Sequence, residues 1–121
     1  MKKILFIEDE AVLQKTVSEV LVNHDYEVLQ ALDGEIGLRI AREKQPDLIL
    51  LDLIMPRKNG FEVLEELKQD ETTKHIPVIV LTNLEGPEEV ERVLNAGATT
   101  YLVKANYSLE EVLQKVKDTI A

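Results

Sequence analysis

The sequence has 121 residues, of which 23 are Asp or Glu and 14 are Lys or Arg, so the formal net charge is −9. This length fits one domain with a sizeable core, and the lack of cysteine excludes a disulfide scaffold or a thiolate metal site. The acidic balance argues against direct nucleic-acid binding, and the first apolar run is too short for a signal or membrane segment. We expect one soluble, cytoplasmic domain over residues 1–121.

Short, continuous apolar runs predict five β-strands. Each run has about four residues and is partly β-branched, as is typical of strands buried on both faces of a parallel sheet. In chain order, the predicted strands are Ile4–Ile7, Val28–Leu32, Leu48–Leu51, Val78–Leu81 and Tyr101–Val103.

The segments between these runs carry apolar residues at helical spacing. The clearest example is the last, with Leu109, Val112, Leu113, Val116 and Ile120. Local signals agree with helices in these segments: Ser108 and Glu111 form a predicted capping box, and Asn59 with Glu62 is a second predicted cap. Pro87 stands at a helix start, and Gly97 stands at a helix end. The alternation of strands and helices predicts an α/β domain with five βα units.

Polar side chains stand where the predicted strands end. Glu8 and Asp9 follow the first strand, Asp52 follows the third, and Thr82 and Lys104 follow the fourth and fifth. The carboxyl ends of parallel strands meet at one edge of the sheet, where such folds bind their ligands. Each residue alone is more simply a helix cap or a solvated loop residue. The combination predicts a site, and Asp52 stands in apolar surroundings where an acid needs a partner.

If Glu8, Asp9 and Asp52 approach to about 5 Å, each charged pair costs roughly 3 kcal/mol. A hard divalent cation would offset this repulsion, and an all-oxygen site suits Mg²⁺ or Mn²⁺. A carboxylate beside a cation, an amine and a hydroxyl predicts phosphoryl transfer, with Asp52 as the nucleophile. In that hypothesis Lys104 neutralises phosphoryl oxygens and Thr82 donates a hydrogen bond to the new group.

From Lys2 to about Ile120 the chain resembles the receiver domains of two-component response regulators. The motifs that carry the resemblance are ILFIEDE at Ile4–Glu10, LILLDLIMP at Leu48–Pro56 with Gly60 after it, VIVLT at Val78–Thr82, the turn Ala96–Ala98, and YLVK at Tyr101–Lys104. The resemblance implies a flavodoxin-like three-layer sandwich with a parallel sheet in the order 2-1-3-4-5.

The resemblance also implies residue roles. Asp52 is the expected phosphorylated residue, Asp9 a direct Mg²⁺ ligand, and Glu8 a support for the ion through water. The Ile54 carbonyl would complete the coordination. The expected roles at the other motifs are a switch hydroxyl at Thr82, a phosphate-binding amine at Lys104 and an aromatic switch residue at Tyr101.

The same resemblance implies a phosphoacceptor switch rather than an enzyme acting on other substrates, with activity limited to phosphotransfer to itself and autodephosphorylation. A histidine kinase or phosphotransfer protein would supply the phosphoryl group. The fourth helix, fifth strand and fifth helix would bind an unidentified downstream protein. We expect a monomer or a weak, phosphorylation-dependent dimer, with neither nucleic acid nor membrane as a direct partner.

Two residues depart from the family pattern. Ala105 stands where the family usually has proline after the lysine, and because a cis bond before a residue other than proline costs roughly 3 kcal/mol, we expect a trans Lys104–Ala105 bond. Asn83 stands where a small residue is common, which predicts a changed dephosphorylation rate of unknown sign.

The acidic run Glu85–Glu91 is more simply a solvated helix start than a docking face for a basic partner.

Three other functions stay open. A phosphatase of the haloacid dehalogenase type also uses an aspartate nucleophile and Mg²⁺, but it needs a second acid where Ile54 stands. A flavin or nucleotide binder needs an anion-binding loop after the first strand, where Glu8–Glu10 would repel phosphate. A receiver that has lost phosphorylation and acts only as a docking module is disfavoured by the complete set of site residues.

Overall fold

Five parallel strands form the centre of the fold. The computed structural model describes residues 1–120 except 54, 56–57, 83–86 and 104–107, and of Thr82 and Pro87 only the backbone. The strands are β1 (Lys3–Ile7), β2 (Glu27–Ala31), β3 (Leu48–Asp52), β4 (Val78–Thr82) and β5 (Thr100–Val103). Their order in the sheet is β2-β1-β3-β4-β5, with every neighbouring pair parallel, which confirms the predicted topology.

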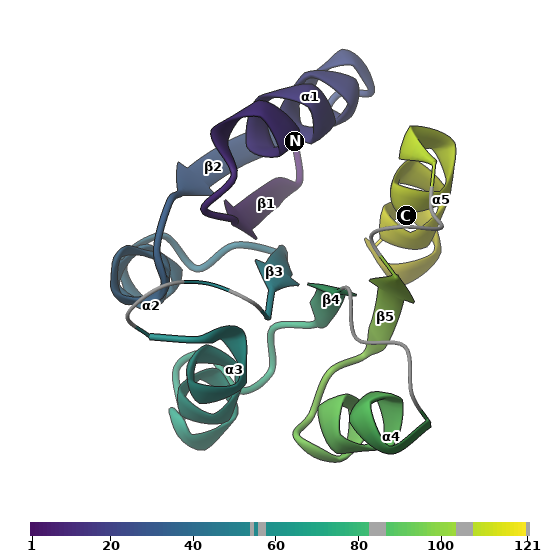
Figure 1. Cartoon of the computed structure of the whole chain (residues 1–121). Helices are drawn as coiled ribbons and strands as arrows, with labels where there is room; N and C mark the ends of the chain where they lie inside the picture. Colours follow the sequence, from purple (N-terminus) through teal and green to yellow (C-terminus); the bar gives the residue numbers. More distant parts are fainter. Residues whose placement is uncertain (54, 56–57, 83–86, 104–107, 121) are drawn as a thin grey trace.

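Five helices cover the two faces of this sheet. They are α1 (Ala11–Asn23), α2 (Gly34–Lys44), α3 (Gly60–Gln69), α4 (Pro87–Asn95) and α5 (Leu109–Ile120). Figure 1 shows α1 and α5 on one face and α2, α3 and α4 on the other. This confirms the predicted three-layer sandwich. No helix in the described part of the chain is both long enough and apolar enough to cross a bilayer.

Each face of the sheet has its own hydrophobic core. Side chains of α1 and α5, such as Val17 and Val116, pack with Ile4 and Phe6 of β1 on one face. Side chains of α2, α3 and α4, such as Leu38 and Leu64, pack with Leu5 of β1 on the other. Successive strand residues point to opposite faces, so β1 and β3 are apolar at nearly every position because both of their faces are covered.

The observed strands differ from the predicted ones at their ends. β3 and β4 extend one residue further, so Asp52 and Thr82 are the last residues of their strands. β2 ends at Ala31, and Leu32 beyond it is 52% exposed. The difference follows from position: β3 pairs on both sides and its ladder continues to Asp52, whereas β2 pairs only with β1 at the edge of the sheet.

Local sequence signals place the helix ends correctly. The Glu62 backbone N–H donates to Asn59 Oδ1 (3.0 Å), and the Glu111 N–H donates to Ser108 Oγ (3.2 Å), so both predicted cap side chains bind their helices. α4 begins at Pro87, as predicted. Gly97 follows α4 with φ +110°, a conformation that favours glycine.

Candidate functional site

Three carboxylates meet at the carboxyl edge of the sheet. Glu8 follows β1 directly, Asp9 comes next, and Asp52 ends β3, the neighbouring strand. One carboxylate oxygen from each lies within 4.8 Å of the others. Glu8 and Asp52 are buried, with 0% and 1% of their surface exposed, whereas Asp9 is exposed. Solvent therefore reaches the cluster at Asp9, whereas the protein shields Glu8 and Asp52 from it.

Backbone hydrogen bonds fix Glu8 at the end of β1. Its N–H donates to the Ala31 carbonyl (3.0 Å), which continues the contact between β1 and β2 one residue past the paired strands. Its Oε2 accepts a hydrogen bond from the Glu10 N–H (3.2 Å), which turns the chain into α1. The Glu8 side chain is thus bound to the turn that carries Asp9.

The start of α3 packs closely against the backbone of Asp52 and of Leu53, the residue after it. The Gly60 N–H donates to the Leu53 carbonyl (2.9 Å). A Cβ atom at Gly60 would lie 2.4 Å from the Asp52 carbonyl oxygen and 2.4 Å from Leu53 Cα. Because only backbone stands in the way, no side-chain movement could relieve this clash, and glycine is needed where α3 begins.

The donor set fits a hard divalent cation. Its three carboxylates supply oxygen atoms alone, the ligand type that Mg²⁺ and Mn²⁺ favour. At separations below 4.8 Å, ionised carboxylates repel one another by about 3 kcal/mol per pair. A cation relieves this repulsion, so Glu8, Asp9 and Asp52 are residues that could hold one.

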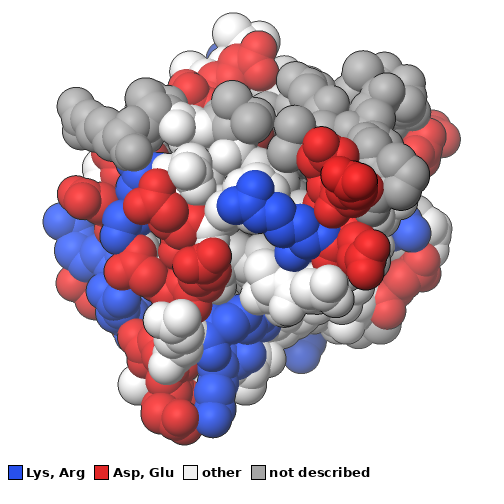
Figure 2. Space-filling model, turned by 60° about the horizontal axis from the view of Figure 1, so that its bottom comes forward, with Lys and Arg blue, Asp and Glu red and all other residues white. Residues whose placement is uncertain are grey.

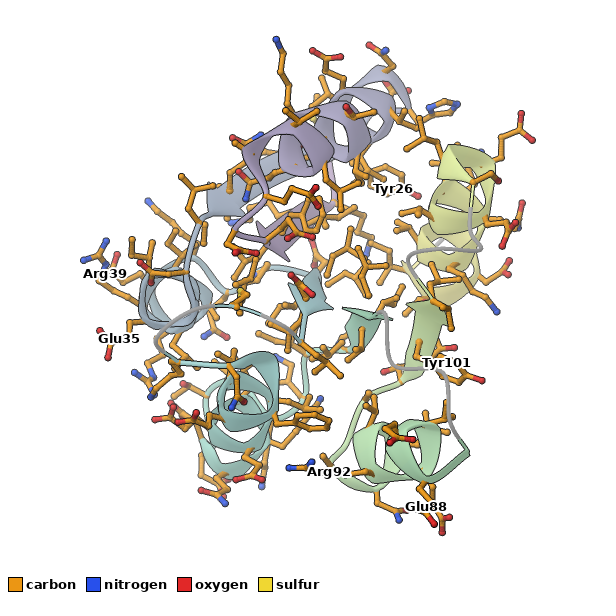
Figure 3. The ribbon with its side chains drawn as sticks, in the orientation of Figure 1. Tyr26, Glu35, Arg39, Glu88, Arg92 and Tyr101 are labelled. Atoms are coloured by element: carbon orange, nitrogen blue, oxygen red, sulfur yellow. The ribbon has the colours of Figure 1, made fainter. Side chains whose placement is uncertain are left out.

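The remaining predicted site residues are described only in part. Thr82 ends β4 and pairs with Val103 of β5, but its side chain lies outside the described structure. Lys104 and Ile54 lie outside it altogether, as do Asn83 and Ala105 with the Lys104–Ala105 bond. Tyr101 is half-buried on β5 and packs against the core on the face of α2, α3 and α4 (Figure 3).

One buried polar residue beside the site was not predicted from the sequence. Gln14 of α1 is 4% exposed, and its side-chain amide donates to backbone carbonyls at the ends of β1 and β2. The apolar spacing of this segment predicts Leu13, Val17, Val20 and Leu21 as its buried face, but Leu13 is only half-buried. A signal was present, since Gln14 lies three and seven residues before the buried Val17 and Leu21 and therefore on their face.

Comparison with known proteins places this geometry in a family. The response regulator receiver domain family matches residues 4–117. The chain is 40% identical over 117 residues to the DNA-binding dual master transcriptional regulator RpaA of Synechocystis, covering 97% of this chain and 48% of RpaA. It is 35% identical over 106 residues to protein PilH of Pseudomonas aeruginosa, covering 86% of each chain. Against Response regulator PleD of Caulobacter vibrioides, it spans 22% of the relative's length.

A solved structure agrees along almost the whole chain. Chemotaxis response regulator CheY4 of Vibrio cholerae superposes with a TM-score of 0.91 at 31% identity, covering 98% of each chain. A parallel sheet in the order 2-1-3-4-5 with an acidic cluster at its carboxyl edge thus defines a receiver-type α/β protein. The chain belongs to the response regulator receiver domain family, whose members are phosphoacceptors in two-component signalling.

Proposed function

We propose that Asp52 is the residue that accepts the phosphoryl group and that Glu8, Asp9 and Asp52 hold the Mg²⁺ this transfer requires. The observation that carries the proposal is the approach of three carboxylate oxygens to within 4.8 Å at the carboxyl edge of the sheet. Asp52 is buried, as Glu8 is, and it ends the central strand β3, as expected of a nucleophile held in one orientation.

The proposed reaction is a transfer between a phosphohistidine and a carboxylate. An Asp52 carboxylate oxygen attacks the phosphorus atom, a P–O bond forms, the P–N bond breaks, and the histidine ring leaves with the electron pair and takes up a proton. A bound Mg²⁺ supplies positive charge for the phosphoryl oxygens. Glu8 stays buried at the end of β1, while Asp9 is exposed where the ion and its water would enter. The chain acts on no second substrate, so its reactions are this transfer and the hydrolysis of the acyl phosphate.

Four further residues are assigned on their sequence motifs. Lys104 would neutralise phosphoryl oxygens, and the Ile54 carbonyl would complete the coordination of the ion. Thr82 would bind the new phosphoryl group through its hydroxyl, and the end of β4 lies beside β3, where this contact is needed. Movement of the Thr82 hydroxyl toward the phosphoryl group would let Tyr101 move inward from its half-buried position on β5.

The proposed partners follow from this switch. A cytoplasmic histidine kinase or phosphotransfer protein supplies the phosphoryl group, and the surface formed by α4, β5 and α5 binds a downstream protein. The chain acts as a monomer or as a weak dimer that forms on phosphorylation. A phosphoaspartate carries about −1.5 to −2 charges where the carboxylate carried −1, and this change can bias two states of the α4 region.

Phosphorylation with a small donor tests the site. We expect the wild-type protein with acetyl phosphate and Mg²⁺ to gain the mass of one phosphoryl group, in a bond that hydroxylamine cleaves. Asp52→Asn should gain none, because an amide is not a nucleophile for this transfer. Asp118→Asn changes an exposed acid on α5 and should behave as the wild type does. Equal modification of Asp52→Asn and the wild type would contradict the proposal.

A phosphatase of the haloacid dehalogenase type is the second candidate, because it shares the aspartate nucleophile. That chemistry needs a general acid two residues after the nucleophile, where this chain has Ile54. We therefore expect the wild type to hydrolyse p-nitrophenyl phosphate no faster than the acyl phosphate on Asp52 is hydrolysed. The rate of Ile54→Asp, which introduces the missing acid, is compared with the wild-type rate. Fast multiple turnover by the wild type would favour the phosphatase.

A further inference from the structure

Gln14 lies beside the acidic cluster and has no part in the chemistry proposed above. It stands in the first turn of α1, and its side chain is buried. Its Nε2 lies 2.9 Å from the Ala31 carbonyl oxygen, 3.1 Å from that of Phe6 and 3.4 Å from that of Glu8. An amide nitrogen has two hydrogens, so these bonds are shared, and the one to Glu8 is the longest.

The three carbonyls belong to Phe6, the second-last residue of β1, to Glu8, the residue after β1, and to Ala31, the last residue of β2. Pairing between the two strands ends at Ile7 and Ala31, so Glu8 follows immediately after the regular ladder. The Ala31 carbonyl accepts from both the Glu8 N–H and the Gln14 amide. The side chain of Gln14 therefore continues the sheet's hydrogen bonding at the point where β1 leaves it.

The backbone of Gln14 closes the same turn from the other side. Its N–H donates to the Glu10 carbonyl (3.0 Å), and the Glu10 N–H donates to Glu8 Oε2. Glu8, Asp9 and Glu10 are thus bound at one end to the strands and at the other to α1. Since Asp9 has no neighbour in the ladder, the path of these residues decides where its carboxylate lies relative to Asp52.

We infer that Gln14 is a positioning residue for the carboxylates of Glu8 and Asp9, and that it sets the Mg²⁺ affinity of the site without touching the ion. The inference rests on the proposed function. Replacing the amide with an apolar group would remove one buried donor from these carbonyls, although the Ala31 carbonyl would still accept from the Glu8 N–H. The turn would then shift to let water supply the missing hydrogen bonds. The three carboxylates would then no longer share one arrangement suited to the cation.

Gln14→Met tests this inference because methionine has nearly the same length and no N–H donor. Isothermal titration with Mg²⁺ should show an affinity roughly tenfold weaker than that of the wild type, the lower end of effects from residues that orient metal ligands. Amide exchange measured by NMR should be faster at Glu8, whose N–H shares the Ala31 carbonyl with Gln14. If Gln14→Met does not fold, Gln14→Asn is used instead, because its side chain is one methylene shorter and moves the amide away from the three carbonyls.

Val17→Ala is the matched control. Val17 is buried on the same face of α1, one turn further on, and its truncation removes packing from the core without touching the turn. It should keep the wild-type Mg²⁺ affinity. An equal loss of affinity in Val17→Ala, or wild-type affinity in a folded Gln14→Met, would overturn the role of Gln14. Failure of the wild type itself to bind Mg²⁺ would instead overturn the proposed site and, with it, this inference.

Discussion

The carboxylate of Asp70 has its acidity set by three donors. Asp70 follows α3, and it accepts hydrogen bonds from the Thr72 hydroxyl (2.7 Å), the Thr72 backbone N–H (2.8 Å) and Arg42 Nε (2.9 Å). These bonds favour the ionised form and lower the pKa of Asp70 from 3.8 to about 2, with the Thr72 hydroxyl as the largest cause. A short-range contact between neighbours in sequence thus matters more here than the ion pair with α2.

Thr72→Val should raise the pKa of Asp70 toward 3.8, because valine keeps the shape of threonine and loses the hydroxyl. Since the pKa is lowered in the folded state, the stabilisation is present above pH 3.8 and is lost as the pH falls toward 2. The variant should therefore have a lower free energy of unfolding than the wild type at pH 5, and the difference should shrink below pH 3.8 and be lost as the pH falls through 2. Carboxyl ¹³C titration by NMR and urea unfolding measure the two effects.

Thr72→Ser provides the control for this prediction. Serine retains a hydroxyl donor at the same position, so the pKa of Asp70 should stay well below 3.8. If Thr72→Val titrates at the wild-type pH, the hydroxyl is not what stabilises the Asp70 carboxylate.

At the scale of elements, α3 and α4 are joined by an aromatic contact. The Arg92 guanidinium carbon lies 3.8 Å from the centre of the Phe61 ring, and Figure 3 shows the arginine reaching from α4 toward α3. Phe61 is the second residue of α3, directly after the Gly60 that lies against Asp52. The contact therefore connects the start of α3, beside the acidic cluster, with a helix of the proposed partner-binding surface.

Arg92→Met should lower the free energy of unfolding by about 0.5–1 kcal/mol, the usual strength of an exposed cation–π contact. Methionine keeps most of the apolar stem and removes the charge. The same substitution in a Phe61→Leu background should cost less, so a double-mutant cycle in urea should show the double variant less destabilised than the sum of the two single variants. Arg39→Met, at an exposed arginine on α2, should show no such coupling with Phe61→Leu. Equal costs of Arg92→Met in both backgrounds would refute the contact.

At the scale of the whole molecule, negative charge is distributed unevenly. Figure 2 shows Asp and Glu in several groups with Lys and Arg between them. The formal charge is −9, and the three carboxylates of the cluster contribute −3 of it within a few ångströms. In α4, Glu88 and Glu89 stand in the first turn, where the helix dipole favours negative charge. The excess on α4 is thus accommodated by the helix dipole, whereas the three carboxylates of the cluster lie close together, where a bound cation would offset their repulsion.

Addition of Mg²⁺ should therefore stabilise the entire fold. At ten times its dissociation constant, an ion that binds only the folded state adds about 1.4 kcal/mol, or about 5 °C in Tm for a domain of this size. Asp9→Asn should lose most of this rise, because it removes the exposed carboxylate of the cluster. Asp118→Asn should retain it. Differential scanning calorimetry with and without Mg²⁺ measures the shift, and an equal rise in Asp9→Asn and the wild type would contradict the assignment of the ligands.

Much of this architecture could be predicted from the sequence. Several signals depend only on residues that are close in sequence, so the sequence alone reveals them. They are the five apolar runs, the cap residues Asn59 and Ser108, and Pro87 at the start of α4. The same is true of the acidic residues after the strands, because parallel strands bring their carboxyl ends to one edge. The motifs within these segments also indicate the receiver family, which the family match over residues 4–117 confirms.

Other features depend on which segments meet in space. Gln14 has a polar side chain on an apolar helix face, and it is buried because the ends of β1 and β2 present carbonyls to it. The Arg92–Phe61 contact joins residues from two helices that only the packing of α3 and α4 brings together. Periodicity and propensity describe each segment alone, whereas these contacts arise from long-range packing. Tertiary structure alone shows three carboxylate oxygens within 4.8 Å, because that distance depends on the register of β1 against β3 and on the turn after β1.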